Sequence, residues 1–205
     1  MSEPLKIGVL ISGSGTNLQA ILDAVAEGWL PVQVVQVVSS RPDAYGIQRA
    51  EAAGVPVLVM DRARYADPLA ADAEIAAALQ AAGAEYVVMA GYMRKCTPAL
   101  LNAFPDKVIN LHPALLPSFV GAHAIQDAFD AGVKVTGVTV HFANEDYDKG
   151  PIIAQRPVVV RSSDTLEDVE ERIHQTEHVL YPEVLLALAQ GKVTLGEDRK
   201  VYVSE

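Results

Sequence analysis

The first hundred residues alternate between two hydrophobic periodicities, and this alternation restricts the possible folds more than any other feature. Apolar runs with the length of strands stand at Lys6–Ser12, Val32–Ser39, Val55–Met60, Tyr86–Met89 and Lys107–Leu111. Segments with helical spacing separate them, at Asn17–Glu27, Tyr45–Ala53, Leu69–Ala82 and Pro98–Ala103. A parallel crossover usually contains a helix, so this order is typical of a parallel sheet with helices on both faces. We therefore expect a doubly wound, mostly parallel, Rossmann-like α/β fold.

The pattern changes after Pro117. Ala124–Ala131 has the spacing of a short helix, whereas Val133–Ala143 and Ile152–Val160 are long strand-like runs separated by a polar turn. A short turn joins antiparallel strands rather than parallel ones. We expect this antiparallel pair to extend one edge of the parallel sheet.

A long helix and a small hairpin are expected at the carboxyl end of the sequence. The helix covers Thr165–Ala189, and we assign Asp164 as its N-cap because Glu167 follows three residues later, as in a capping box. The tail at Lys192–Val203 has the pattern of a hairpin. No repeat, low-complexity segment or linker interrupts the sequence, so residues 1–205 are interpreted as a single domain.

Composition restricts the class of partner. The formal net charge of the 205 residues is −10 and no basic run offsets it, which argues against nucleic acid. No apolar run approaches the ~18 residues that a membrane helix needs, and the first residues lack the pattern of a secretion signal. Cys96 is the only cysteine, which fits a reducing cytoplasm. We expect a cytoplasmic protein that acts on small molecules, as a monomer or a homodimer.

A glycine-rich loop, ISGSGTN, follows the first expected strand and opens the first helix. Glycines at this place let backbone N–H groups approach an anion at a helix N-terminus. A dinucleotide fingerprint would need a third glycine where Leu18 stands, and the Gly-Lys-Ser/Thr of a Walker loop is absent. The side chains of Thr16 and Asn17 suit one terminal phosphate. We favour a phosphate site over a plain turn in which Asn17 caps the helix.

Three polar side chains define a candidate reaction centre. Asn110 and His112 end a short apolar strand within VINLHPALLP, and Asp148 lies in a turn within VHFANEDYDKGPII. Alternation along the strand places the first two on one face, at the carboxyl end where open α/β sheets bind ligands. An amide can hold a carbonyl oxygen, an imidazole can move a proton, and a carboxylate can orient the imidazole. Together they suit a non-covalent acyl transfer, provided that the hairpin carrying Asp148 lies beside that strand end.

Other kinds of site have less support. We assign structural roles to His141, within a strand, and to His178, within the long helix, and a loop-shaping role to His123. The five histidines show no spacing typical of zinc, so no metal is expected. Cys96 has no histidine nearby in the sequence and no G-x-S-x-G elbow exists, which argues against covalent catalysis.

Five segments closely resemble the phosphoribosylglycinamide formyltransferases, which are folate-dependent enzymes of purine synthesis. The resemblance extends from about Lys6 to about Leu188, and its markers are ISGSGTNLQA, MAGYMRKC, VINLHPALLPSF, GVTVHFANEDYDKGPIIAQ and HQTEHVLYP. The middle three are similar to folate formyl-transferring enzymes in general. The first is typical of the glycinamide ribonucleotide enzymes, where it carries the substrate phosphate.

The resemblance implies the formyltransferase fold and a role for each motif. Formyl transfer from 10-formyltetrahydrofolate to the amine of glycinamide ribonucleotide, in de novo purine (IMP) biosynthesis, is the implied reaction. The implied catalytic residues are Asn110 and His112, which stabilise an oxyanion, and Asp148, which assists proton transfer. The implied binding residues are Gly15, Thr16 and Asn17 for the phosphate, Glu177 for the glycinamide end of the substrate, and Met93, Arg94, Lys95, Cys96 and Asn110 for the folate. A phosphate-binding half would span about 1–105 and a catalytic and folate-binding half about 106–205.

Four residues depart from the family pattern, and none of them removes an implied catalytic group. Pro68 stands where some members have an arginine at the folate site, and Val120 stands where proline usually precedes Gly-x-His. His174 replaces a glutamine near the substrate, and Lys149 adds a cation beside Asp148. These departures bear on substrate affinity rather than on the chemistry.

Two related enzymes fit less well. Methionyl-tRNA formyltransferase carries a further C-terminal domain, for which the sequence has no room. Formyltetrahydrofolate deformylase carries an N-terminal regulatory domain and usually has a second histidine where this sequence has Pro113. We therefore expect neither activity.

Two further classes stay open on the residues alone. Ser39, Ser40 and Arg41 end the second strand, and with the glycine loop they allow an NADP-dependent oxidoreductase. That interpretation leaves VINLHPALLP unexplained. A non-catalytic phosphosugar-binding domain would keep the phosphate loop but give no role to the three polar side chains of the candidate centre.

Overall fold

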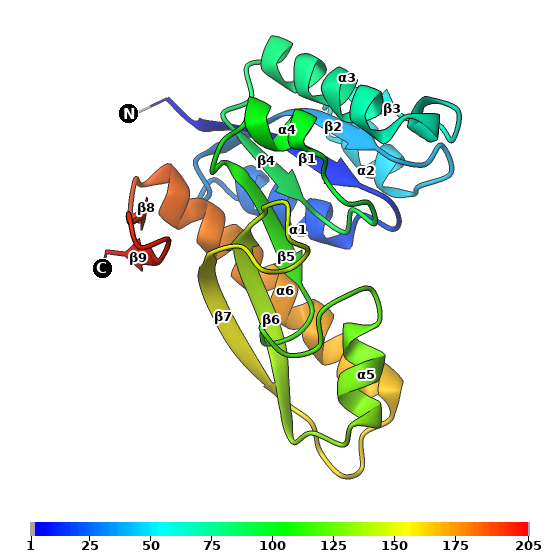
Figure 1. The fold of residues 1–205 in the computed structure, drawn as a ribbon, viewed down its shortest axis with the longest axis vertical. Coiled ribbons are helices and arrows are strands. Elements are labelled where there is room, and N and C mark those ends of the chain that lie inside the picture. The colour runs from blue at the N-terminus through cyan, green and yellow to red at the C-terminus, as the bar shows by residue number, and fades with distance from the viewer. Residues whose placement is uncertain (1–2, 205) are drawn as a thin grey trace.

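A seven-stranded sheet forms the centre of the computed structural model, which describes residues 3–204 (Figure 1). Its strand order is β3-β2-β1-β4-β5-β6-β7. The first five strands in that order run parallel to one another. Strands β6 and β7 are antiparallel additions at one edge, as the sequence predicts. The strands are β1 (Leu5–Ile11), β2 (Val32–Ser39), β3 (Val57–Val59), β4 (Tyr86–Met89), β5 (Val108–His112), β6 (Val135–Phe142) and β7 (Ile152–Val159).

Helices cover both faces of the sheet (Figure 1). One face packs against α1 (Thr16–Ala26), α2 (Gly46–Ala52) and α6 (Leu166–Ala189), and α5 (Ala124–Asp130) lies against α6. The other face packs against α3 (Pro68–Ala81) and α4 (Pro98–Ala103), with a 3-10 turn at Arg64–Ala66 before α3. A doubly wound α/β fold results, which confirms the expected fold class. No helix in residues 3–204 is long and apolar enough to cross a membrane.

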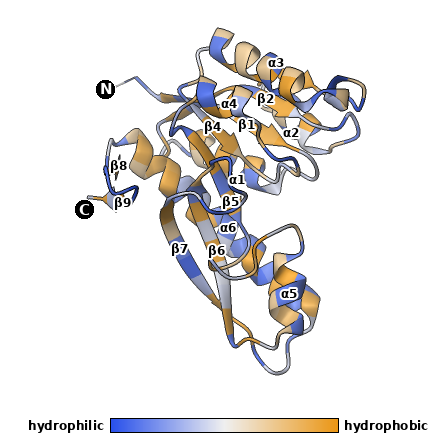
Figure 2. Cartoon of the chain, in the orientation of Figure 1, coloured by the Kyte–Doolittle hydropathy of each residue, from blue (hydrophilic) through white to orange (hydrophobic). Residues whose placement is uncertain are grey.

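Two hydrophobic clusters fill the layers on either side of β1. Val9 belongs to the cluster under α1 and α6, and Leu10 belongs to the cluster under α3 and α4, because successive side chains of a strand point to opposite faces. Figure 2 shows the hydrophobic residues gathered along the central strands, whereas β7 at the edge carries hydrophilic segments. Burial on both faces explains why the parallel strands are continuous apolar runs.

The strand order reverses between β1 and β4. The chain moves outward from β1 to β2 and β3, and then returns to place β4 on the other side of β1. The loops that follow β1 and β4 therefore leave the sheet in different directions and open a crevice at their carboxyl ends, where open α/β sheets bind ligands. The glycine-rich loop and the segment Gly91–Thr97 flank this crevice.

The cap of α6 differs from the expectation in one residue. Thr165, not Asp164, is the N-cap, and it forms a reciprocal capping box with Asp168. Asp164 instead pairs with Arg172, about two turns inside the helix, at 2.9 Å. A carboxylate with an arginine in reach gains more from that ion pair than from one backbone N–H, which leaves the cap to the threonine. The expected tail hairpin is present as β8 (Val193–Leu195) and β9 (Val201–Val203).

Tyr181 fixes the long helix to the middle of the sheet. Its ring is fully buried, and its hydroxyl donates to the carbonyl oxygens of Met89 and Ile109, at 3.0 and 3.1 Å. These carbonyls belong to β4 and β5, the two strands that lead into the crevice. One hydroxyl from α6 therefore joins the last residue of β4 to the second residue of β5.

Replacing Tyr181 with phenylalanine removes that hydroxyl and leaves the ring in place. We expect Tyr181→Phe to lower the free energy of unfolding by about 1 kcal/mol, because a buried hydrogen bond is lost without a cavity. Tyr202→Phe is the matched control, since its hydroxyl bonds Asp198 on the surface, and it should change stability by less than about 0.5 kcal/mol. Urea unfolding of both variants measures this, and equal effects would contradict the role of the buried hydroxyl.

Candidate active site

The structure brings together the three polar side chains that the sequence analysis singled out. Asn110 and His112 lie near the end of β5, and the neighbouring strand β6 runs antiparallel to it with Asn110 opposite His141. The loop after β6 then folds back over the end of β5 and carries Asp148 to both side chains. The hairpin thus lies where the acyl-transfer hypothesis requires it.

Asp148 is the centre of this group, and only 6% of the residue is exposed. One carboxylate oxygen, Oδ2, lies 3.4 Å from Nδ1 of His112 and accepts the backbone N–H of Gly121 at 3.1 Å. The other oxygen, Oδ1, accepts from Nδ2 of Asn110 at 3.5 Å. The backbone of Asp148 has a positive φ of 54°, a conformation that aspartate tolerates better than most residues and that often marks a functional position.

His141 lies inside this group, although the sequence analysis gave it a structural role. Its Nδ1 lies 2.9 Å from the carbonyl oxygen of Phe142, which can only accept, so Nδ1 carries the proton. Nε2 is then an acceptor and receives Nδ2–H of Asn110 at 3.2 Å. Burial is the main cause that lowers the pKa of His141, which keeps the ring neutral at neutral pH. The β5–β6 register is what places His141 here, and a single sequence does not reveal that register.

The orientation of the Asn110 amide follows from these two partners. One N–H points to His141 with an ordinary hydrogen-bond length, and the other points toward Asp148 at the long limit of a hydrogen bond. The second N–H is therefore the donor that an incoming carbonyl oxygen can compete for.

His112 is 4% exposed, and its Nε2 donates to the carbonyl oxygen of Phe119 at 2.8 Å. Phe119 belongs to the loop after β5, together with Val120 and Gly121, and both Phe119 and Gly121 have positive φ. The loop thus covers the imidazole through Phe119 and the carboxylate of Asp148 through Gly121. Val120 itself is 42% exposed, and the bonds that cover the two groups come from its neighbours on either side.

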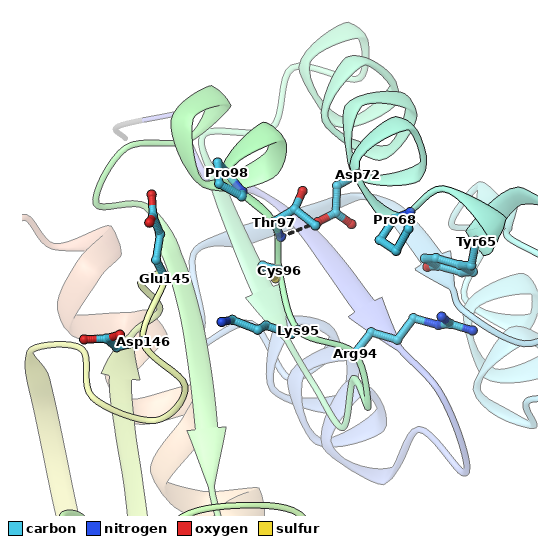
Figure 3. Close-up of a pocket in the computed structure, with 10 residues that line it drawn as sticks. All are labelled: Tyr65, Pro68, Asp72, Arg94, Lys95, Cys96, Thr97, Pro98, Glu145 and Asp146. Atoms are coloured by element: carbon cyan, nitrogen blue, oxygen red, sulfur yellow. Dashed lines mark hydrogen bonds between the residues drawn. The ribbon is translucent and has the colours of Figure 1, made fainter.

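A cavity of about 650 Å³ opens beside the trio (Figure 3). Arg94, Lys95 and Cys96 line it from the segment after β4, and they also line a smaller hollow that reaches Asn110 and Asp148. The residues in Figure 3 come from the 3-10 turn and the start of α3, from the segment between β4 and the first residue of α4, and from the loop at Glu145 and Asp146. A flat ligand with one end at the trio could extend along this segment.

The side chains of that segment have different environments. The guanidinium of Arg94 stacks on Tyr65, 3.6 Å from the ring centre, and Met93 is exposed. Burial raises the pKa of the Cys96 thiol to about 12, so Cys96 is a neutral wall residue rather than a nucleophile. Pro68 lines the same cavity as Tyr65.

The glycine-rich loop opens α1 without a side-chain cap. Gly15 is the N-cap and has a left-handed backbone, with φ 71° and ψ 29°, so the expected alternative of an Asn17 cap is wrong. A Cβ on Gly15 would lie 2.6 Å from the Cα of Gly46, which means that α2 closes directly on the loop. Arg49 of α2 also donates to the carbonyl oxygen of Ser14 at 2.9 Å. The N–H groups of the first turn of α1 are left for an anion.

Asn17 and Glu177 join the loop to α6. Nδ2 of Asn17 donates to Oε2 of Glu177 at 2.9 Å, and both residues are buried. Oδ1 of Asn17 is buried and has no partner within residues 3–204. Burial is the main cause that raises the pKa of Glu177, and the bond from Asn17 and the charge of His174 oppose it. The carboxylate is therefore held at an energetic cost that a ligand with hydroxyl or amine donors would relieve.

The residues that allowed an NADP site already have partners within the chain. Ser39 donates to the carbonyl oxygen of Arg41, the hydroxyl of Ser40 bonds that of Ser12, and Arg41 pairs with Asp43 at 2.6 Å. The geometry offers no free donor set for a ribose phosphate there. In residues 3–204 no group of three or more histidine, cysteine or acidic side chains is arranged to hold a metal ion.

The buried carboxylate of Glu177 makes a pH-dependent prediction. A raised pKa in the folded state means that stability is lost as the pH rises from the unfolded value, about 4.3, through the folded one. Glu177→Gln should therefore have a higher free energy of unfolding than wild type at pH 7, and the difference should vanish below about pH 4. Glu183→Gln, at an exposed position of the same helix, is the control and should show no such gain. Chemical denaturation at several pH values decides this, and a gain that persists at low pH would refute burial as its cause.

Comparison with known proteins agrees with this geometry. The formyl transferase family matches residues 5–185. A phosphoribosylglycinamide formyltransferase of Haemophilus influenzae is 40% identical over 94% of this chain and 91% of its own length, and one of Bacillus subtilis is 41% identical over 89% and 94%. The crystal structure of a glycinamide ribonucleotide transformylase of Symbiobacterium toebii superposes with a TM-score of 0.96 and 48% identity, covering 100% of this chain and 96% of that one. Fold, site geometry and sequence agree that the chain belongs to the formyl transferase family.

Proposed function

We propose that this chain transfers the formyl group of 10-formyltetrahydrofolate to the amine of N1-(5-phospho-D-ribosyl)glycinamide. The products are the N-formyl ribonucleotide and tetrahydrofolate, in de novo purine synthesis. The meeting of Asn110, His112 and Asp148 at one strand end, beside a cavity of about 650 Å³, is the observation that carries the proposal. The named relatives support the same reaction. Both substrates are small and soluble, which fits a cytoplasmic enzyme without a resident metal.

The free amine of the ribonucleotide attacks the formyl carbon, and the carbonyl oxygen becomes an oxyanion. Asn110 donates to this oxygen through the N–H that now makes the long bond to Asp148. His112 shares the stabilisation through Nε2–H, which requires the Phe119 carbonyl to leave that proton. The loop after β5 therefore has to shift when the formyl group enters.

Asp148 balances the proton transfers of the reaction. The attacking amine must lose a proton, and the folate nitrogen must gain one as its bond to the formyl carbon breaks. The carboxylate lies against His112 and Asn110, so it can receive the proton, directly or through water, and return it toward the leaving nitrogen. No covalent intermediate with the protein forms, in keeping with the neutral thiol of Cys96.

The ribonucleotide spans the crevice. Its phosphate binds at Gly15, Thr16 and Asn17, where the first turn of α1 offers backbone donors. Glu177 then faces the rest of the substrate, and its buried carboxylate accepts from polar hydrogens there. The buried, unpartnered Oδ1 of Asn17 supplies a further acceptor at the same place.

The folate lies along the segment after β4. Arg94, Lys95 and Cys96 form one wall, with the exposed Met93 at the start of the segment, and the hollow that these three residues share with Asn110 brings the formyl nitrogen to the reaction centre. Arg94 and Lys95 also give local positive charge, which suits an anionic folate tail although the net charge of the chain is −10.

The decisive assay mixes the protein with 10-formyltetrahydrofolate and follows the absorbance of the folate product. We expect product only when the ribonucleotide is present, and we expect His112→Ala to abolish it while circular dichroism stays unchanged. Product without the ribonucleotide would point to a deformylase instead. Binding of both ligands without turnover would favour the phosphosugar-binding class and reject the proposal.

The role of Asn110 has its own test. Asn110→Ala should lower kcat about 10²- to 10³-fold, because one donor to the oxyanion is lost, and should change KM little. Asn102→Ala, on the exposed side of α4, is the matched control and should leave both constants unchanged. Steady-state kinetics on purified variants distinguish them, and a rise in KM alone would assign Asn110 to binding rather than to the reaction.

A further inference from the structure

Ser12 connects the two loops that flank the crevice. It follows β1 directly and precedes the glycines of the phosphate loop. Its backbone N–H donates to the carbonyl oxygen of Gly91 at 3.1 Å, and its hydroxyl oxygen accepts the backbone N–H of Met93 at 2.9 Å. Both partners belong to the segment after β4. A single residue thus forms two hydrogen bonds across the point where the strand order reverses.

Burial makes this connection durable. Ser12 is 5% exposed and Ser40 is 4% exposed, and their hydroxyls bond each other at 2.6 Å. Ser40 is itself held by its backbone N–H, which donates to Ile11 at 2.9 Å. Water has little access to replace the bond to Met93, so opening it would leave a buried polar group without a partner.

The far end of the same segment is also fixed. The backbone N–H of Thr97 donates to the carboxylate of Asp72 at 2.6 Å, as Figure 3 shows. Residues 93–97 are therefore held at one end by α3 and at the other by the residue next to the phosphate loop. A shift of Ser12 moves the start of the segment, whereas the end stays in place.

We propose that Ser12 is a positioning residue that couples the two substrate sites, so that occupation of the phosphate loop pre-organises the folate segment. The inference rests on the proposed function, because the two ligands are those of the formyl transfer. Ligand contacts at Gly15–Asn17 order the loop, the loop holds Ser12, and Ser12 holds the N–H of Met93 in place. The entropy cost of ordering the segment is then met when the first ligand binds, so the second ligand does not have to meet it again.

Equilibrium binding tests the coupling without turnover. Tetrahydrofolate lacks the formyl group, so its dissociation constant can be measured by calorimetry with and without saturating glycinamide ribonucleotide. We expect the ribonucleotide to tighten tetrahydrofolate binding to wild type by about fivefold or more, and Ser12→Ala to reduce that factor to below about twofold. Linkage requires the same factor when the order of addition is reversed, which checks each measurement.

Ser40→Ala is the matched control. It removes a hydroxyl of the same burial from the same pair, but it leaves the bond between Ser12 and Met93. It should keep the coupling of wild type, and equal losses in both variants would overturn the proposal. Unchanged coupling in Ser12→Ala would overturn it as well.

The wild-type protein provides a second measurement that needs no variant. Inorganic phosphate should slow hydrogen exchange of the Met93 amide, since a more ordered loop opens the bond to Ser12 less often. Unchanged exchange at saturating phosphate would contradict the coupling. If wild type binds both ligands independently, the coupling is rejected and the proposed function stands. If wild type binds neither ligand, both the coupling and the proposed function are rejected.

Discussion

The buried carboxylate of Asp148 is the interaction on which the arrangement of the site depends. Taking a carboxylate out of water is costly unless polar partners surround it, and here they come from two separate parts of the chain: Asn110 and His112 of β5, and the Gly121 N–H of the loop after β5. Strand β5 is itself held in place, because it pairs with β6 and because the hydroxyl of Tyr181 in α6 donates to the carbonyl oxygen of Ile109. The requirement to satisfy one charge thus links the parallel core to the antiparallel edge.

Much of the fold follows from local pattern. The apolar runs and helical spacings of the first hundred residues predict the parallel sheet, because burial on both faces leaves a clear imprint on each strand. The cap of α6 lies one residue from the predicted position, because the sequence offers two neighbouring candidates and Arg172, about two turns along the helix, pairs with Asp164. A side-chain competition of this kind cannot be read from spacing.

The polar groups of the candidate site could be predicted from the sequence, but the residues that they bond to could not. Asn110, His112 and Asp148 stand in unusual motifs, so the residue types alone suggest chemistry. The position of His141 depends on a strand register, and the bonds of Ser12 to Met93 depend on the reversal of strand order. The bond from Nδ2 of Asn17 to Glu177 joins residues 160 positions apart in the sequence, and no local pattern around Asn17 indicates it. Such pairs exist only once the whole sheet has formed.

The contact between Gly15 and Gly46 limits how this chain can vary. The glycine-rich loop is exposed only at Gly13 and Ser14, whereas Gly15 is buried against α2. Exposed loop positions ordinarily tolerate replacement. Here α2 lies so close that Gly15 cannot carry a Cβ in place, because that atom would lie 2.6 Å from the Cα of Gly46. Gly15 also has a left-handed backbone that other residues adopt only with strain. Two glycines two positions apart therefore face opposite constraints: a side chain on Gly13 would enter open space, whereas one on Gly15 would require the backbone of α2 to move.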